Sequence, residues 1–233
     1  MKNLYLILLL FACFSCELFN KEEEEEKGLL LKKIWYSDVN YTEFIYNENN
    51  DVSKMIVNGN VFNVITKNGL VDKVIRSNYD TLHYFYDSRN RIIKLTDPGI
   101  AYEARIFYNQ DNKERAVIYD TDNGDYIDPA LIYYTYENNN LVKNRYVDKN
   151  GEIISNYSSY DTNPNPFLYS SQALILTYGD FSANNPGRLL TVAGNSESTS
   201  DYVYEYNSEG YPTKRIRISE GDTIYVYKYE YIR

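Results

Sequence analysis

Hydrophobic and polar residues alternate with a period of two along most of the chain, and short polar runs interrupt the alternation. The clearest case is residues 84–95, YFYDSRNRIIKL, in which the polar run DSRN separates two alternating segments. Alternation around an Asp/Asn-rich break predicts a β-hairpin. In the returning segment, strict alternation places Ile92 and Lys94 on one face and Ile93 and Leu95 on the other.

Similar hairpins recur through most of the chain at a spacing of roughly twenty residues, which leaves no room for helices between the strands. The sequence therefore predicts an all-β fold, an antiparallel meander of Tyr-rich hairpin repeats that is coiled or partly rolled. The further predicted turns are 47–50, 67–69, 109–112, 137–140, 148–151 and 207–210.

The hairpin pattern breaks between residues 161 and 195, where three of the chain's prolines occur. We expect an insertion near 161–187, built as a short helix or a loop. Residues 170–178, SSQALILTY, fit either a helix packed on the sheet or a strand. A meander cannot cover both of its own faces, so an insertion that covers one end of the sheet is physically reasonable.

The N-terminus reads as a secretory signal. Lys2 supplies a positive charge, and residues 4–14 form an apolar run that is too short to cross a bilayer, which takes about 20 residues as a helix. We therefore assign residues 1–16 as a signal peptide, 17–30 as a tether and 31–233 as the β-hairpin repeat domain.

Two cysteines near the end of the signal resemble the lipobox cysteine of bacterial lipoproteins. Cys13 has Leu10 three positions before it, whereas Cys16 has the small Ser15 before it and the acidic Glu17 behind it. We favour Cys16 as the lipidated residue; a plain signal peptide with incidental cysteines is the alternative. No cysteine follows Cys16, so the mature chain has no disulfide.

The tether contains five consecutive glutamates, residues 22–26, which repel one another and resist packing. One interpretation is a solvated spacer that holds the domain away from the lipid surface. The other is sorting, because an acidic run just after a lipidated cysteine resembles the surface-export signal of Bacteroidota lipoproteins. Both predict an outer-membrane, lipid-anchored protein, and the second also predicts surface exposure.

The composition limits the classes of partner that we expect. The formal net charge is −9, and no basic stripe is present, so a nucleic-acid partner is not expected. The same charge disfavours adsorption to anionic lipid, which leaves the lipid anchor as the membrane attachment. Tyrosine is the compositional outlier, with 27 residues of 233, and aromatic residues favour sheet.

The hairpin at residues 84–95 resembles the YD repeats of Rhs-type proteins and teneurins, which build extended β-sheet shells: Tyr-x-Tyr-Asp, a short polar turn, then Arg-Ile. The whole of residues 31–233 is similar to a group of Bacteroidota lipoproteins that carry a domain of unknown function. The similarity rests on the Asn-Pro-Phe segment at 165–167, the Asn-Asn-Pro segment at 184–186 and the closing EGYPTK at 209–214. These resemblances imply the fold and the envelope location, and they carry no established activity.

Candidate chemistry is sparse. His83 is the only histidine and alternates within a predicted strand, which indicates a packed structural residue. Residues 120–125, DTDNGD, have oxygen ligands but lack the full pattern of a calcium loop, and the same residues make an ordinary turn. A pair of carboxylates for glycoside hydrolysis cannot be singled out among 33 acidic residues. We therefore predict no catalytic residue, no metal and no cofactor.

Alternating tyrosines near the C-terminus are the candidate ligand-binding face. Tyrosine suits a half-exposed sheet face because its ring buries area while its hydroxyl stays wet, so a purely structural role competes with stacking on a sugar or a protein partner. We expect the last strand to place its tyrosines on one face, against Ile224, Val226, Lys228 and Glu230 on the other, beside those of the preceding hairpin. The candidate face is Tyr202, Tyr204, Tyr206, Tyr225, Tyr227, Tyr229 and Tyr231.

These features favour a non-catalytic cell-envelope lipoprotein with a binding role, for glycan or an envelope protein, or with a structural role. One alternative is a glycoside-acting enzyme, and another is an accessory of envelope assembly or secretion. A carboxylate pair inside a deep pocket would favour the enzyme, whereas a broad tyrosine face would favour binding.

The anchoring hypothesis predicts that the mature protein begins at a lipidated Cys16. Two or more acyl chains give stable membrane attachment, which one chain does not. The intact mass of the membrane-extracted protein tests this. An unlipidated N-terminus would refute the anchor, and lipid on Cys13 would correct only its position.

Overall fold

The computed structural model describes residues 28–76, 81–99, 102–109, 114–121, 130–167 and 182–233. The predicted signal peptide, most of the tether, residues 170–178 and most of the DTDNGD segment lie outside these ranges. Residues 30–232 form one compact unit. Among the described residues, no helix has the length and apolar character needed to cross a membrane.

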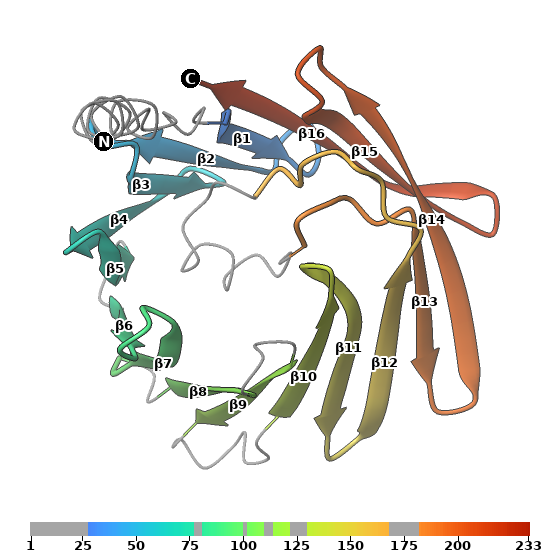
Figure 1. The fold of residues 1–233 in the computed structure, drawn as a ribbon, viewed down its shortest axis with the longest axis horizontal. Helices are drawn as coiled ribbons and strands as arrows, with labels where there is room; N and C mark the ends of the chain where they lie inside the picture. The colour runs from blue at the N-terminus through green and yellow to red at the C-terminus, as the bar shows by residue number, and fades with distance from the viewer. Residues whose placement is uncertain (1–27, 77–80, 100–101, 110–113, 122–129, 168–181) are drawn as a thin grey trace, which may run out of the picture. The chain divides into compact units, whose positions relative to one another are not determined.

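The described residues form sixteen strands, each antiparallel to the next, and β1 also pairs with β16. The sheet of residues 30–232 is therefore a closed ring (Figure 1). The predicted all-β antiparallel meander is confirmed, and its rolling goes to full closure. The strands are β1 (Leu30–Trp35), β2 (Tyr41–Tyr46), β3 (Val52–Val57), β4 (Asn60–Lys67), β5 (Leu70–Arg76), β6 (Thr81–Tyr86), β7 (Ile92–Asp97), β8 (Tyr102–Tyr108), β9 (Glu114–Thr121), β10 (Ala130–Glu137), β11 (Asn140–Asp148), β12 (Gly151–Ser158), β13 (Arg188–Ala193), β14 (Ser196–Tyr206), β15 (Pro212–Ser219) and β16 (Asp222–Ile232).

Three five-residue turns share one hydrogen-bonding pattern. After β2, the Asn47 side-chain oxygen accepts the backbone N–H groups of Asn49 and Asp51, both at 2.9 Å. The side-chain oxygens of Asp87 after β6 and Asn207 after β14 likewise accept the backbone N–H groups of the residues two and four positions later. The fourth turn residue has a positive φ in each, which asparagine and glycine tolerate: Asn50 (63°), Asn90 (59°) and Gly210 (83°). The repeated turn sequence therefore fixes where each of these hairpins reverses.

The strand after such a turn does not follow strict alternation. Tyr86 lies opposite Ile92, but Phe85 lies opposite Lys94, so β7 carries one extra residue, a β-bulge. Ile92 and Leu95 consequently share the buried face, while Ile93 is 39 % exposed. The predicted pairing of Ile93 with Leu95 on one face, and of Ile92 with Lys94 on the other, was wrong because the bulge shifts the register by one residue.

Each odd-numbered strand pairs with the even-numbered strand that follows it. At the end of five of these odd–even ladders, a tyrosine hydroxyl joins the two strands. In each pair the tyrosine lies three residues beyond the last paired residue of the even strand, as Tyr46 lies beyond Glu43. Its hydroxyl donates to the carbonyl two residues before the first paired residue of the odd strand, as at Leu31 before Lys33. The five pairs are Tyr46 to Leu31 (2.6 Å), Tyr86 to Val71 (2.8 Å), Tyr108 to Ile92 (2.9 Å), Tyr204 to Pro186 (3.0 Å) and Tyr231 to Pro212 (2.7 Å).

We call this contact the tyrosine latch. Tyr160, beyond the end of β12, makes a related contact to the Leu141 carbonyl. The latched tyrosines point to the inside of the ring, where Tyr46, Tyr86 and Tyr108 pack against the core. At each latch, the ladder leaves the carbonyl without a partner on the neighbouring strand. Because a buried carbonyl requires a hydrogen-bond donor, the tyrosine hydroxyl supplies one.

Most of the buried core residues lie on β1–β8. A closed sheet of this many strands is too wide for small wall side chains alone to fill, and Phe167, from the segment after β12, joins the core. The buried core residues are Leu31, Ile34, Phe44, Val52, Met55, Val64, Val71, Val74, Leu82, Tyr84, Ile92, Leu95, Ala104, Ile106, Tyr134, Leu141, Phe167 and Tyr229.

The insertion between β12 and β13 begins and ends in a polar cluster. Asp161 accepts hydrogen bonds from the backbone N–H and the side-chain amide of Asn185, and from the Tyr206 hydroxyl. Asn165, at 2.9 Å from its backbone N to the Ala183 carbonyl, ties the two arms together. The described arms, 159–167 and 182–187, are loop with one isolated bridge between Pro164 and Asn184. The Asn-Pro-Phe and Asn-Asn-Pro segments therefore hold the ends of the insertion and direct Phe167 inward.

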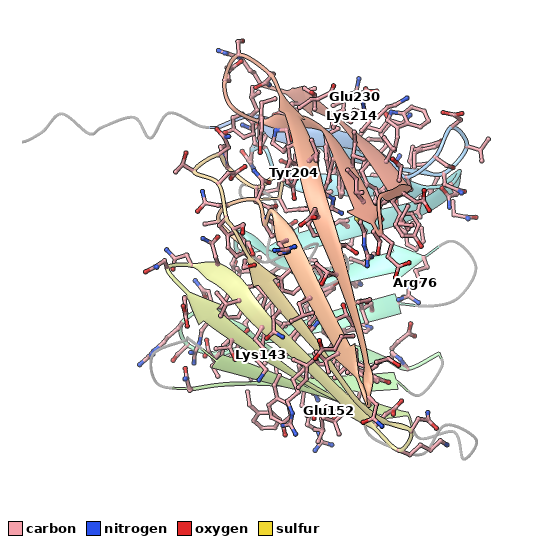
Figure 2. The ribbon with its side chains drawn as sticks, turned by 90° about the vertical axis from the view of Figure 1, so that its right-hand side faces the viewer. Arg76, Lys143, Glu152, Tyr204, Lys214 and Glu230 are labelled. Carbon is pink, nitrogen blue, oxygen red and sulfur yellow. The ribbon has the colours of Figure 1, made fainter. Side chains whose placement is uncertain are left out.

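The outer face of the wall carries charges in the middle of many strands. Lys33 pairs with Glu43 and Lys94 with Glu103, each at 3.6 Å between neighbouring strands. Figure 2 labels further charged residues of this kind: Lys143 on β11, Glu152 on β12, Lys214 on β15 and Glu230 on β16. In lipid, each outward Lys or Arg near the midplane would cost about 2–4 kcal/mol. The outer face of the described strands therefore presents charged pairs beside exposed apolar side chains such as Ile45, Phe85 and Ile153.

We expect Tyr86→Phe to destabilise the fold by about 1 kcal/mol, because the ring stays packed but the Val71 carbonyl loses its donor. Tyr133→Phe is the matched control, since Tyr133 lies on the outer face and is 37 % exposed. Urea unfolding of both variants measures the difference. Equal midpoints for the two would show that the latch contributes nothing to stability.

Burial raises the pKa of the Tyr46, Tyr86 and Tyr231 hydroxyls above the ordinary value of about 10. The unfolded chain therefore loses these protons at a lower pH than the folded chain, and stability falls as pH rises above about 10. Thermal unfolding between pH 8 and 11 measures this decline. The decline should be shallower in a variant with phenylalanine at all three positions, and an identical slope would contradict the assignment.

Candidate ligand-binding surfaces

The seven tyrosines of the predicted face lie on β14 and β16 and point to the inside of the ring. The two sets are not neighbours, because β15 lies between them. Tyr204 is opposite Arg215, which is in turn opposite Tyr227. The expectation that the two tyrosine sets lie side by side was therefore wrong, and two arginines that the sequence analysis did not single out, Arg215 and Arg217, separate them.

Four of the seven tyrosines are held by structural contacts. Tyr204 and Tyr231 form latches, and Tyr206 donates to Asp161 of the polar cluster. Tyr229 is buried in the core, opposite Ile34 of β1. Burial raises the pKa of Tyr206, and the nearby Asp161 carboxylate adds to the effect. The hydroxyls of Tyr204, Tyr206 and Tyr231 are therefore engaged within the fold, and the Tyr229 ring is buried.

The remaining three, Tyr202, Tyr225 and Tyr227, form with Arg215 and Arg217 what we call the tyrosine–arginine wall. The Arg215 guanidinium lies 4.6 Å from the ring centre of Tyr227 and 5.5 Å from that of Tyr202. Arg217 lies 6.0 Å from the Tyr225 ring. The Tyr225 and Tyr227 rings stack at 6.3 Å with an interplanar angle of 30°. The wall therefore presents aromatic faces and guanidinium groups on one surface.

The part of the wall nearest the β15–β16 turn is open to solvent. Tyr225 is 50 % exposed, and the inward-facing Ser198 of β14 is exposed as well. Arg217 donates from Nε to the Ser200 hydroxyl at 3.0 Å, and it forms no ion pair with any residue that the structure describes. A polar ligand in this part of the interior would contact the face of the Tyr225 ring, serine hydroxyls and the Arg217 guanidinium. That guanidinium has no carboxylate partner among the residues that the structure describes.

A second surface is a pocket of about 600 Å³ beside β1 and β16, which we call the seam pocket. Trp35, the only tryptophan, donates from its ring N–H to the Glu230 carboxylate at 2.9 Å. Tyr36 packs edge-on against Tyr227 at 5.5 Å, so the pocket adjoins the wall. The lining residues are Trp35, Tyr36, Ser37, Asp38, Ile224, Tyr225, Val226, Lys228 and Glu230.

The other candidates from the sequence do not gather into a site. His83 lies on β6 between Lys73 of β5 and Thr96 of β7, on the outward face. Of the DTDNGD segment, residues 122–125 lie outside the described ranges. Among the residues that the structure describes, no three His, Cys, Asp or Glu side chains come together in a way that could hold a metal ion.

Comparison with known proteins identifies the fold. No protein-family model and no curated protein matches the chain. Among solved structures, the chain is similar to a porin-like protein from Bacteroides uniformis, with a TM-score of 0.59 and 15 % identity over 88 % of this chain and 95 % of that one. It is also similar to a porin-like protein from Bacteroides vulgatus, with a TM-score of 0.66 and 9 % identity over 88 % of this chain and 99 % of that one. The likeness at these identities concerns the fold.

Proposed function

We propose that this protein is a non-catalytic lipoprotein of the outer membrane that binds an acidic glycan on the tyrosine–arginine wall. The observation that carries the proposal is the exposed surface around Arg217, where a guanidinium, the Tyr225 ring and the Ser198 hydroxyl face the inside of the ring. Tyrosine rings pack on the apolar faces of sugars, while guanidinium groups pair with carboxylates or sulfates in a bidentate manner.

The setting of the site agrees with a surface location. The charged outer face of the strands suits a ring that lies in water, attached to the membrane by lipid on Cys16 and separated from it by the acidic tether. The glutamates at 22–26 would then direct the lipoprotein to the cell surface. The porin-like neighbours, which come from Bacteroides, support an envelope protein of this kind.

A glycan array probed with the intact protein tests the proposal, followed by calorimetric titration of the best acidic oligosaccharide. Arg217→Ala should weaken binding by at least about tenfold, because a hydrogen bond to a charged group contributes about 1.5–3 kcal/mol. Lys214→Ala is the matched control, since Lys214 lies on the same strand but faces outward and pairs with Glu205.

Removing the acidic group from the oligosaccharide should weaken binding to the wild type and leave the weak binding to Arg217→Ala unchanged. If no glycan binds, or if Arg217→Ala and Lys214→Ala bind equally well, the wall is not the glycan site.

A further inference from the structure

One strand edge remains open although the sheet is closed. β16 begins at Asp222, but its pairing with β1 starts only at Lys228, opposite Trp35. After Trp35 the chain turns away, as the Tyr36 backbone N–H donates to the Asn40 carbonyl at 2.8 Å. Residues 222–227 of β16 therefore pair with β15 on one side and, among the described residues, with no strand on the other.

This edge has only one of the features that usually protect an exposed strand, a β-bulge at Ile224 between the paired residues Thr223 and Tyr225. Natural edges carry prolines, charges or bulges that block pairing with another chain. Between Thr223 and Tyr227 there is no charge and no proline, and Ile224 is 46 % exposed. Another strand that extends past its neighbour, β14 at residues 196–199, carries Glu197 among serines and threonine. The β16 edge is the apolar one of the two.

The seam pocket lies directly against the open edge. Ile224, Tyr225 and Val226 of the edge line the pocket, and so do Ser37 and Asp38 of the loop after β1. Since paired strands lie about 4.8 Å apart, a strand added to the β16 edge would occupy the pocket. The loop at Ser37 and Asp38 limits this space. The space therefore suits a single extended strand better than a hairpin that belongs to a second folded ring.

The charge around the pocket indicates the chemistry of that strand. Two carboxylates, Asp38 and Glu230, line the pocket with one ammonium, Lys228, and Asp222 lies at the other end of the edge. Ile224 and Val226 line the pocket together with Trp35, so apolar side chains of the added strand would contact apolar surface there. A lysine or arginine in the same segment would balance the carboxylates.

We propose that the β16 edge binds an extended segment of a partner protein by strand addition. The segment has apolar residues at alternate positions, at least one Lys or Arg, and no proline where it pairs. Main-chain hydrogen bonds to residues 223–227 supply affinity, and the seam pocket supplies selectivity. The seam pocket shares Tyr225 with the tyrosine–arginine wall, but this proposal does not depend on glycan binding.

The test is a phage-displayed library of random twelve-residue peptides, selected on the intact protein and counter-selected on Ile224→Lys. The matched control is Ile65→Lys, because Ile65 is an outward isoleucine of β4 with 39 % exposure, far from the seam. The best peptide is then synthesised together with a version that has proline at its centre and a version with Glu in place of Lys or Arg. Trp35, the only tryptophan, reports binding through its fluorescence.

We expect the selected peptide to shift Trp35 fluorescence and to protect the amides of residues 223–227 from hydrogen exchange. Binding should weaken at least tenfold with Ile224→Lys or with the proline peptide, less with the Glu peptide, and not with Ile65→Lys. If no peptide prefers the wild type over Ile224→Lys, the proposal fails. It also fails if dilution alone changes both the molecular mass and the Trp35 signal, since the edge would then pair with a second copy.

Discussion

The structure depends on satisfying the backbone carbonyls that the ladders leave unpaired at one end of the ring. Neighbouring odd and even strands stop pairing there, as at Lys33 and Glu43, and a buried carbonyl without a donor is costly. A tyrosine hydroxyl supplies the donor at five such positions, always at the same offset from the end of the ladder. Phenylalanine would fill the same space but leave the carbonyl unsatisfied. Five of the 27 tyrosines of the chain thus have a role that the architecture itself requires.

The latch and the turn belong to one repeating unit. Tyr46 and Tyr86 precede an Asn or Asp that begins the five-residue turn and organises it with its side chain. The turn places the tyrosine at the end of its strand, and the bulge that follows the turn returns the apolar residues of the next strand to the interior. Where the insertion interrupts the repeat, the same contacts persist with altered partners, as Tyr204 reaches Pro186 and Tyr206 reaches Asp161.

Most tyrosines on the inner face have a structural role, so the few that do not are informative. On β14–β16 the interior changes from apolar packing to a surface with Arg215, Arg217 and the half-exposed Tyr225. The outer face carries charges such as Lys33 and Lys94 beside exposed apolar residues. The fold is similar to that of the porin-like Bacteroides proteins, and its β14–β16 section presents tyrosines and arginines on the inner face.

The local features of the structure could be predicted from the sequence. Period-two alternation and the Asn/Asp-rich turns determine the antiparallel hairpins, because both act over a few residues. What only the tertiary structure decided involves residues far apart in the chain. Closure joins Leu30 to Ile232, the bulges moved Ile92 and Leu95 to one face, and β15 placed two arginines between the tyrosine sets. How the ring closes also decides which tyrosines latch a carbonyl and which lie beside arginines. It brings Trp35 and Ile224 to the same pocket. No pattern along the chain encodes that geometry.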